Sequence, residues 1–448
     1  MRFTPHTPED RRRMLERIGV TSVDILFAAI PEELRLRQPL PLPPPLSEPE
    51  ALEEASRLAA LNKHSGELIC FAGAGAYDHY IPATVDAVIS RPEFYTAYTP
   101  YQPEVSQGTL QSIYEYQSLV CRLLEMEVAN ASMYDCASAL AETTHMARDI
   151  TGRKKVVVSA GVNPVWIEVI RTYARGLDIL IETAPLSAYA SDTGKLSTLL
   201  GDDTAAVFVQ HPNFFGVLEP MNAISALCHE HGTLLVVAVD PISLGILAPP
   251  GNYGADIAVA EGQPLGLPLS YGGPYLGIMA TRRQFVRNLP GRLVARTSDA
   301  KGRTGYVLAL QTREQHIRRE RATSNICTNQ ALCALAASVY LATLGRNGLC
   351  EVARQCLAKS RYLANSIATV PGFEMEISVP FFREFVVRTG PTASEVVAAG
   401  VEHGFLAGVD LGRYSPEWRN LLLVAVTERR NRHEMDAYVA FLRKEFGH

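Results

Sequence analysis

Apolar runs alternate with amphipathic segments through the middle of the chain. Helical spacing of apolar positions predicts helices over residues 109–124, 138–151 and 164–176. Short apolar runs predict strands at 155–159, 178–181, 207–210, 234–239 and 256–260. Continuous apolar strands separated by helices are typical of a parallel sheet that is covered on both faces. We therefore predict an α/β protein built on a large parallel or mixed sheet.

The pattern differs on either side of this region. Helical spacing over 10–18 and 22–29 precedes a proline-rich segment at 39–45, which favours an extended strap across the subunit surface over a ligand for a proline-binding partner, and 48–62 is predicted to be a helix. After a long helix at 328–344 we expect a smaller antiparallel sheet with strands at 373–377, 383–388 and 421–426 and helices at 393–403 and 432–445. The predicted parts are an N-terminal helical arm with a proline-rich strap (1–64), a large domain (65–330) and a small C-terminal α+β domain (331–448).

Composition narrows the classes of protein. The chain has 448 residues, 47% of them hydrophobic and 20% charged, as in ordinary globular proteins. A net charge of −5 does not favour nucleic-acid binding. We expect a cytoplasmic protein with no signal peptide and no membrane span, because the N-terminus is charged and eight cysteines without a Cys-x-x-Cys pair fit a reducing compartment. Neither the Cys327/Cys333 spacing nor Cys228-His229-Glu230-His231 predicts a metal site.

Residues 71–80 contain Gly73-Ala74-Gly75 but lack the third glycine and the later acid of a dinucleotide-binding loop, so nicotinamide binding is not predicted. Asp78 and His79 lie side by side in this segment. Neighbouring side chains point in different directions, so we expect a structural role for this pair rather than a catalytic dyad.

The order of strands and acids from 207 to 264 resembles that of pyridoxal-phosphate (PLP) enzymes of the aspartate-aminotransferase type, fold type I. In that fold the acid that ends the middle strand pairs with the pyridinium nitrogen, and the Schiff-base lysine follows the next strand. Here Asp240 ends the strand 234–239, but the chain has no lysine between Lys195 and Lys301, and Pro264 or its neighbours stand in the lysine's place. We therefore expect no covalent catalytic residue in this chain.

Asp135 precedes the helix at which such an enzyme holds the phosphate of the cofactor. Free N–H groups and the helix dipole favour an anion at a helix N-terminus. Asp135 is a good N-cap, so its carboxylate would satisfy those donors and would repel phosphate. This is a second indication that the chain's own cofactor site is closed.

Two polar clusters are candidates for contact with a substrate or a cofactor. One is a loop region that either packs at an interface or lines a site; its candidate residues are Tyr95, Tyr98, Tyr101, Gln102, Glu104, Ser106 and Gln107. The other lies before a long helix and has more polar and thiol side chains than N-capping requires; its residues are Thr323, Ser324, Asn325, Cys327, Thr328 and Asn329. Most of the charged run 313–321 before it is predicted to be a solvated helix face.

At these residues the chain resembles the glycine cleavage system P-protein family, glycine dehydrogenase (decarboxylating). The matching stretches are 71–80, 99–110, 130–134, 211–216, 254–277 and 313–330. The length and the missing lysine resemble subunit 1, the alpha subunit, of the split form of that family.

The resemblance implies a homologous beta subunit that carries the PLP lysine and an α2β2 heterotetramer. It also implies decarboxylation of glycine, with release of CO2 and transfer of the aminomethyl group to the lipoyl arm of H-protein. By the same resemblance, 323–329 would reach the phosphate or the rim of the site in the beta chain. Tyr95, Tyr98 and 102–107 would form part of the glycine pocket or the lipoyl channel.

Two alternatives stay open. One is an enzyme that acts alone with Lys154, Lys155 or Lys195 as its PLP lysine, although all three precede the strand that carries Asp240. The other is a non-catalytic scaffold of the same ancestry. Mutating the two polar clusters separates a scaffold from a catalytic subunit. If the variants lose enzyme activity while assembly stays intact, the chain is not merely a scaffold.

Overall fold

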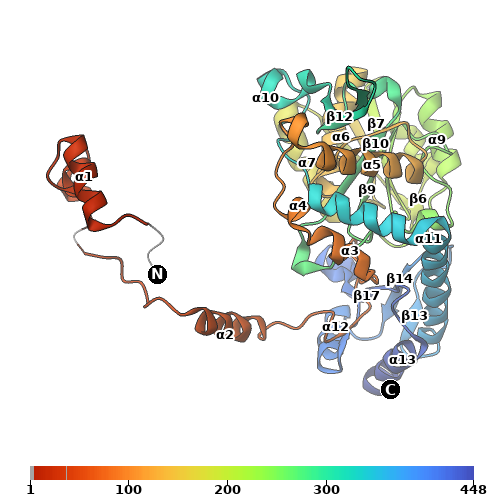
Figure 1. Cartoon of the computed structure of the whole chain (residues 1–448). Helices are drawn as coiled ribbons and strands as arrows, with labels where there is room; N and C mark the ends of the chain where they lie inside the picture. Colours follow the sequence, from red (N-terminus) through yellow and green to blue (C-terminus); the bar gives the residue numbers. More distant parts are fainter. Residues whose placement is uncertain (1–4, 37, 448) are drawn as a thin grey trace. The chain divides into compact units, whose positions relative to one another are not determined.

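The computed structural model describes residues 5–36 and 38–447. The chain divides into two compact units, Met1–Lys63 and His64–His448 (Figure 1). The division into three parts expected from the sequence stays a prediction.

The first unit contains two helices, α1 (Pro8–Ile18) and α2 (Glu48–Ala59). Each begins with a capping box, Thr7 with Asp10 in α1 and Ser47 with Glu50 in α2. The prediction of a helix at 22–29 is wrong in type and length. The structure has a short 3-10 helix, Val23–Phe27, because β-branched and aromatic residues are weak helix formers. A second 3-10 helix covers Glu32–Leu34. In the described part of this unit no side chain is buried, so the unit has no core of its own.

The second unit is built on a seven-stranded sheet in the order β2-β10-β9-β8-β7-β3-β4 (Figure 1). Strands β4, β3, β7, β8 and β9 are parallel, whereas β10 is antiparallel to β9 and β2 is antiparallel to β10. The sheet is therefore mixed, as expected for fold type I. The strands are β2 (Val128–Ala129), β3 (Lys155–Ser159), β4 (Leu180–Ala184), β7 (Thr204–His211), β8 (Leu234–Val239), β9 (Ile257–Glu261) and β10 (Gly277–Thr281).

Alternate side chains of these strands enter two separate hydrophobic cores, one on each face of the sheet. On β8, for example, Leu235 and Val237 pack on one face while Val236 and Ala238 pack on the other. The first face is covered by α5 (Gln107–Leu124), α9 (Met221–Glu230) and the start of α11 (Ala331–Ile367). The second is covered by α6 (Cys136–Thr151) and α7 (Pro164–Ala174).

The long helix predicted at 328–344 is confirmed: α11 has a kink at the non-helical Gly345, and a second helical segment, which was not predicted, continues from there to Ile367 beside the C-terminal sheet. This antiparallel sheet has the order β13-β14-β17-β16 and packs against α11, α12 and α13. Its elements are β13 (Phe373–Met375), β14 (Glu384–Thr389), β16 (Val409–Asp410), β17 (Leu421–Ala425), α12 (Ala393–Glu402) and α13 (Arg432–Phe446).

The sequence did not predict the hairpin of β11 (Leu293–Ser298) and β12 (Thr304–Ala309). The remaining elements are short: α3 (Ala83–Ile89), α4 (Pro92–Tyr95), α8 (Thr193–Leu199), α10 (Gln315–Arg318), β1 (Ile69–Cys70) paired with β15 (Phe405–Leu406), and β5 (Leu186–Ser187) paired with β6 (Ala190–Ser191). Among the described residues, no helix combines the length and apolarity needed to span a membrane.

Candidate functional site

The carboxyl edge of the large sheet carries an ion pair with a side chain of the C-terminal sheet. Asp240 follows β8, and its Oδ2 lies 2.7 Å from Nη2 of Arg383, the residue before β14. The guanidinium carbon of Arg383 lies 3.4 Å from the centre of the Tyr77 ring, and the arginine side chain is 2% exposed. Burial by itself would lower the pKa of Arg383, but Asp240 and the other acidic groups around the guanidinium together outweigh burial and raise the pKa. Arg383 is therefore a buried, charged and planar group held against Asp240.

A second carboxyl group lies at the N-terminus of α6. Glu261, the last residue of β9, accepts a hydrogen bond from the Cys136 N–H at 3.1 Å. Its other oxygen accepts from the N–H groups of Gln263 and Leu276. Burial raises the pKa of Glu261 to about 8, and these backbone donors counter part of that rise. Asp135 caps the helix as predicted, accepting from the Ser138 N–H at 2.7 Å.

These residues do not fit a PLP molecule bound by this chain. The acid that would pair with the pyridinium already holds Arg383, and two N–H donors at the start of α6 already hold Glu261 and Asp135. Pro264 has no amine. The space left at this edge is about 20 Å³, room for about one water molecule.

Glu384 holds the segment that carries Tyr77. Its Oε1 accepts from the Ala74 N–H at 2.7 Å, and the Tyr77 hydroxyl donates to its Oε2 at 2.6 Å. Gln263 accepts from the Tyr77 N–H and donates to the Tyr77 carbonyl. Burial raises the pKa of Glu384 to about 7, against the two hydrogen bonds that lower it. Tyr77 is thus fixed from both the large sheet and the C-terminal sheet.

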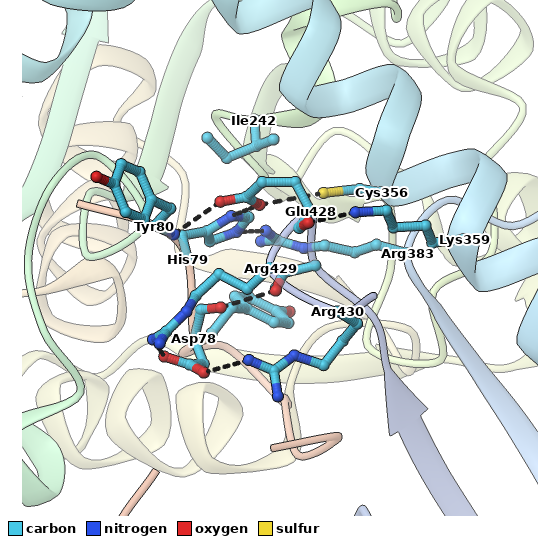
Figure 2. A network of polar contacts seen from close by, with 12 residues as sticks. Asp78, His79, Tyr80, Ile242, Cys356, Lys359, Arg383, Glu428, Arg429 and Arg430 are labelled. Carbon is cyan, nitrogen blue, oxygen red and sulfur yellow. Dashed lines mark hydrogen bonds and ion pairs between the residues drawn. The ribbon is translucent and has the colours of Figure 1, made fainter. Parts of the chain in front are cut away.

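Figure 2 shows how the next two residues are held. Asp78 forms ion pairs with Arg429 and Arg430. His79 Nδ1 lies 2.6 Å from Glu428 Oε2, and its Nε2 contacts Arg383. A guanidinium has no acceptor, so Nε2 accepts and Nδ1 donates to Glu428. Asp78 and His79 point to different partners, as the sequence indicated.

His79, Cys356 and Glu428 place three potential metal ligands within 4.8 Å of one another. Both nitrogens of His79 are already used in protein contacts. Burial raises the pKa of the Cys356 thiol, and the Glu428 carboxylate raises it further, which opposes the thiolate that a metal requires. The cationic Arg383 also adjoins this cluster, so its chemistry is that of a structural network.

The loop with the predicted tyrosines divides into an exposed part and an anchored part. Tyr95, Tyr98 and Tyr101 are 68%, 79% and 60% exposed, and Val105 beside them is 80% exposed. Gln102 and Glu104 are also exposed, and Ser106 is half-buried. Gln107 instead pins the loop to β12, because its side chain donates to the Tyr306 carbonyl and accepts from the Tyr306 N–H.

The second cluster divides in the same way. Asn329 donates to the Ala131 carbonyl and to Ser132 Oγ, while Ser324 is buried and accepts from the Ile326 N–H. Thr323 is half-buried, and the exposed members are Asn325, Cys327 and Thr328.

Arg292 joins the two clusters, although no signal in the sequence pointed to it. Its guanidinium lies 5.8 Å from the centre of the Tyr101 ring and donates to the Cys327 carbonyl at 2.6 Å, and it also approaches Asn329. Arg292 is 6% exposed and precedes the unpredicted strand β11. The structure therefore brings Tyr101 and 327–329 together around a buried arginine.

The prediction that most of the run 313–321 is solvated is confirmed, because residues 316–321 are exposed. Arg313 and Glu314 are largely enclosed. Arg313 donates to the carbonyls of Leu289 and Gly291, which raises the cost of exposing it to water. Burial lowers the pKa of Arg313 to about 10. Arg313 is enclosed because the segment 289–291, distant in sequence, supplies the carbonyl groups to which it donates.

The three lysines of the stand-alone alternative lie elsewhere. Lys154 and Lys155 are at the amino end of β3, whereas Asp240 follows the carboxyl end of the parallel strand β8. They pair with acids such as Asp178 and Asp203. Lys195, on α8, is exposed and lies 3.9 Å from Asp192.

The chain matches the family model described as "Glycine cleavage system P-protein" over residues 1–442. It is 53% identical over 441 residues, 98% of each chain, to a protein of Prosthecochloris aestuarii named probable glycine dehydrogenase (decarboxylating) subunit 1. It is 50% identical over 443 residues, 99% of each chain, to a protein of the same name from Moorella thermoacetica.

A crystal structure of glycine decarboxylase (P-protein) of the glycine cleavage system, in inhibitor-bound form, matches with a TM-score of 0.91 and 44% identity. The match covers 99% of this chain and 100% of that one. Alanine–glyoxylate aminotransferase from Nostoc sp. matches at 16% identity with a TM-score of 0.58, over 93% of this chain and 99% of that one. This likeness shows the fold alone, which is that of PLP-dependent enzymes of fold type I.

Proposed function

Because the chain belongs to the glycine cleavage system P-protein family, we propose that it is the alpha subunit of a two-chain glycine dehydrogenase (decarboxylating). With a homologous beta subunit it decarboxylates glycine and passes the aminomethyl group to the lipoyl arm of H-protein. The assembled enzyme is an α2β2 heterotetramer in the cytoplasm. The cofactor belongs to the beta subunit.

The closed site at the carboxyl edge of the sheet carries this proposal. A chain of a PLP fold that fills its own cofactor position with Arg383 and Glu261 needs another chain to supply the cofactor. When bound there, PLP supplies the electron sink for decarboxylation. What this chain contributes is contact, orientation and exclusion of water at a site in its partner.

The exposed tyrosines support a large interface with the beta subunit. Aromatic residues are enriched in the cores of protein interfaces, and an isolated chain gains nothing from exposing Tyr95, Tyr98 and Tyr101 beside Val105. Burying these groups removes apolar surface from water, and the hydroxyls remain able to bind polar groups. We assign contact with the partner's substrate or cofactor to the exposed members Tyr98, Asn325 and Thr328, together with the half-buried Thr323.

Arg292 gives the interface its local order. Its buried charge holds the 327–329 backbone and the Tyr101 ring in one arrangement before the partner binds. Preorganised groups lose less entropy on association than mobile ones. The anchored residues Gln107, Ser324 and Asn329 position the exposed ones.

The test is reconstitution. The purified chain and its beta subunit are assayed separately and mixed, with glycine and lipoylated H-protein, for release of CO2. Activity only in the mixture, with one bound PLP for each pair of chains, is expected. Decarboxylation by this chain alone, or bound PLP on this chain in the mixture, refutes the proposal.

Two kinds of variant then test the proposed interface with the beta subunit. Val105→Asp buries a charge at the interface and is expected to weaken assembly on size-exclusion chromatography, whereas Leu180→Asp, on the outermost strand β4, is its control. Tyr98→Phe and Thr323→Ala are expected to lower kcat at least tenfold while assembly is retained. Unchanged activity removes that residue from the site, and unchanged activity in both favours the scaffold.

A further inference from the structure

The position that an aromatic cation occupies in this fold is filled by a side chain. Asp240 stands where the acid of a fold type I enzyme pairs with a protonated pyridine ring. Arg383 meets it at 2.7 Å and lies against the face of Tyr77 at 3.4 Å. A guanidinium, like a pyridinium, is planar, delocalised and positively charged, and it stacks on aromatic faces. Arg383 therefore matches the pyridinium ring in its charge, in its planarity and in its partner, Asp240.

The phosphate position is filled as well, by a carboxyl group that accepts the same kind of backbone hydrogen bonds. The Cys136 N–H at the start of α6 donates to the Glu261 side chain, and the Ser138 N–H donates to Asp135. These are the backbone donors that a phosphate would use at a helix N-terminus. Glu261 comes from β9 rather than from the helix, so this arrangement is tertiary and is more than an ordinary cap.

We propose that Arg383 and Glu261 form a built-in replacement for the cofactor. Arg383 takes the place of the pyridinium ring, and Glu261 takes the place of the phosphate. The chain thus keeps the architecture of a loaded PLP domain without binding PLP. The replacement also joins the two sheets, because Arg383 leads into β14 while Asp240 and Glu261 belong to the large sheet.

The surroundings of Arg383 support a fixed and charged group. His79 Nε2 accepts from it, and Figure 2 shows His79 held in turn by Glu428. Removing one partner of a buried ion pair leaves the other charge uncompensated, which is strongly destabilising. Asp240 without a cation would be such a charge, so loss of the Arg383 side chain is expected to destabilise the folded chain.

The first experiment titrates the purified wild-type chain, without any beta subunit, with pyridoxine 5′-phosphate. This analogue has the ring and the phosphate but no aldehyde, so it forms no adducts with surface lysines. Equilibrium dialysis is expected to show no saturable binding up to millimolar ligand. Saturable binding in the micromolar range would overturn the replacement.

The second experiment empties the ring position. Arg383→Ala is expected to lower the melting temperature by several degrees, and low-millimolar ethylguanidinium is expected to restore most of the loss. Ethylammonium, which is charged but not planar, restores much less. The control is Arg388→Ala, which removes an exposed arginine of the same strand paired with Glu376; ethylguanidinium leaves its melting temperature unchanged.

A melting temperature of Arg383→Ala equal to that of wild type, or equal rescue by the two cations, contradicts the proposal. If Arg383→Ala does not fold, Arg383→Lys and the wild-type titration decide the matter. Lysine keeps the charge but has no planar guanidinium, so a melting temperature of Arg383→Lys equal to that of wild type refutes the role of stacking on Tyr77. None of these readouts uses glycine or H-protein, so their outcome is independent of the reconstitution assay.

Discussion

Glu428 offers a measurable test of the network that holds residues 78–80. It accepts hydrogen bonds from His79 Nδ1 at 2.6 Å and from the Tyr80 N–H at 2.7 Å, and its side chain is 11% exposed (Figure 2). Burial raises the pKa of Glu428, but its hydrogen bonds and its electrostatic interaction with His79 together outweigh burial and lower the pKa to about 2. The perturbation is Glu428→Gln, which keeps the shape and the acceptor and removes the charge.

The expected magnitude follows from linkage. A pKa of about 2 in the folded state against 4.5 in the unfolded chain corresponds to about 3 kcal/mol of stability at pH 7. Because the folded pKa is lowered, this contribution is complete above pH 4.5 and is lost as the pH falls through 2. It has fallen to about 1 kcal/mol at pH 3. Glutamine does not titrate, so the advantage of wild type over Glu428→Gln shrinks by about 2 kcal/mol between pH 7 and pH 3.

The assay is urea unfolding of both proteins between pH 7 and pH 3, followed by tryptophan fluorescence. The control is Glu376→Gln, which removes a carboxylate paired with the half-exposed Arg388 and is expected to change the pH dependence of stability less than Glu428→Gln does. A wild-type advantage over Glu428→Gln that stays constant from pH 7 to pH 3 would refute the assigned role of the Glu428 charge.

Three further predictions concern the other buried groups. Burial raises the pKa of Glu261 to about 8, so its stability contribution is present below pH 4.5 and is lost as the pH rises through 8; melting curves at pH 6 and pH 9 should therefore show a larger fall for wild type than for Glu261→Gln. Gly216→Ala should sharply lower the yield of soluble protein, since the new Cβ would lie 1.9 Å from the Glu384 carbonyl oxygen at φ +82°, whereas Gly152→Ala, at φ +70° in open space, should cost only about 1–2 kcal/mol in urea unfolding. Arg292→Lys keeps the charge but loses the planar guanidinium with its several donors, so kcat of the reconstituted enzyme should fall while assembly measured by size-exclusion chromatography persists. An unchanged kcat would show that Arg292 does not order residues 327–329 and Tyr101 for catalysis.

The central strands β3, β7, β8 and β9 could be predicted because nearly all of their residues are buried on both faces, whereas β10, which is equally buried, and the two-residue β2 were not predicted. Val236 and Val237, for example, enter opposite cores, so the run 234–239 is apolar throughout. The β11–β12 hairpin lacks this property. Its strands contain exposed residues such as Arg296 and Thr304, so neither an apolar run nor regular alternation marks them. In the first unit the error is the opposite, a predicted element that is absent: the amphipathic spacing predicted a helix at 22–29, where the chain forms only a short 3-10 helix, Val23–Phe27.

The local features of the closed site were also predictable. The missing lysine and the Asp135 N-cap are visible within a few residues of sequence. Arg383 carried no such signal, because an arginine at the start of a strand is ordinary until the fold places it against Asp240. The same holds for Arg292 and Arg313, whose burial depends on carbonyl groups supplied by distant segments.

The buried pair at the sheet edge has a cost that stability alone does not justify. Replacing a buried ion pair with apolar residues of similar volume is often neutral or stabilising. An apolar pair in place of Asp240 and Arg383 would still fill the space. It would lose the contact of the guanidinium with His79 and its stacking on Tyr77. The ion pair instead selects one arrangement of the C-terminal sheet, the 77–80 segment and the large sheet. A subunit that presents groups to a site in its partner needs that single arrangement more than it needs additional stability, because a displacement of about 1 Å at a catalytic site can cost about a hundredfold in rate.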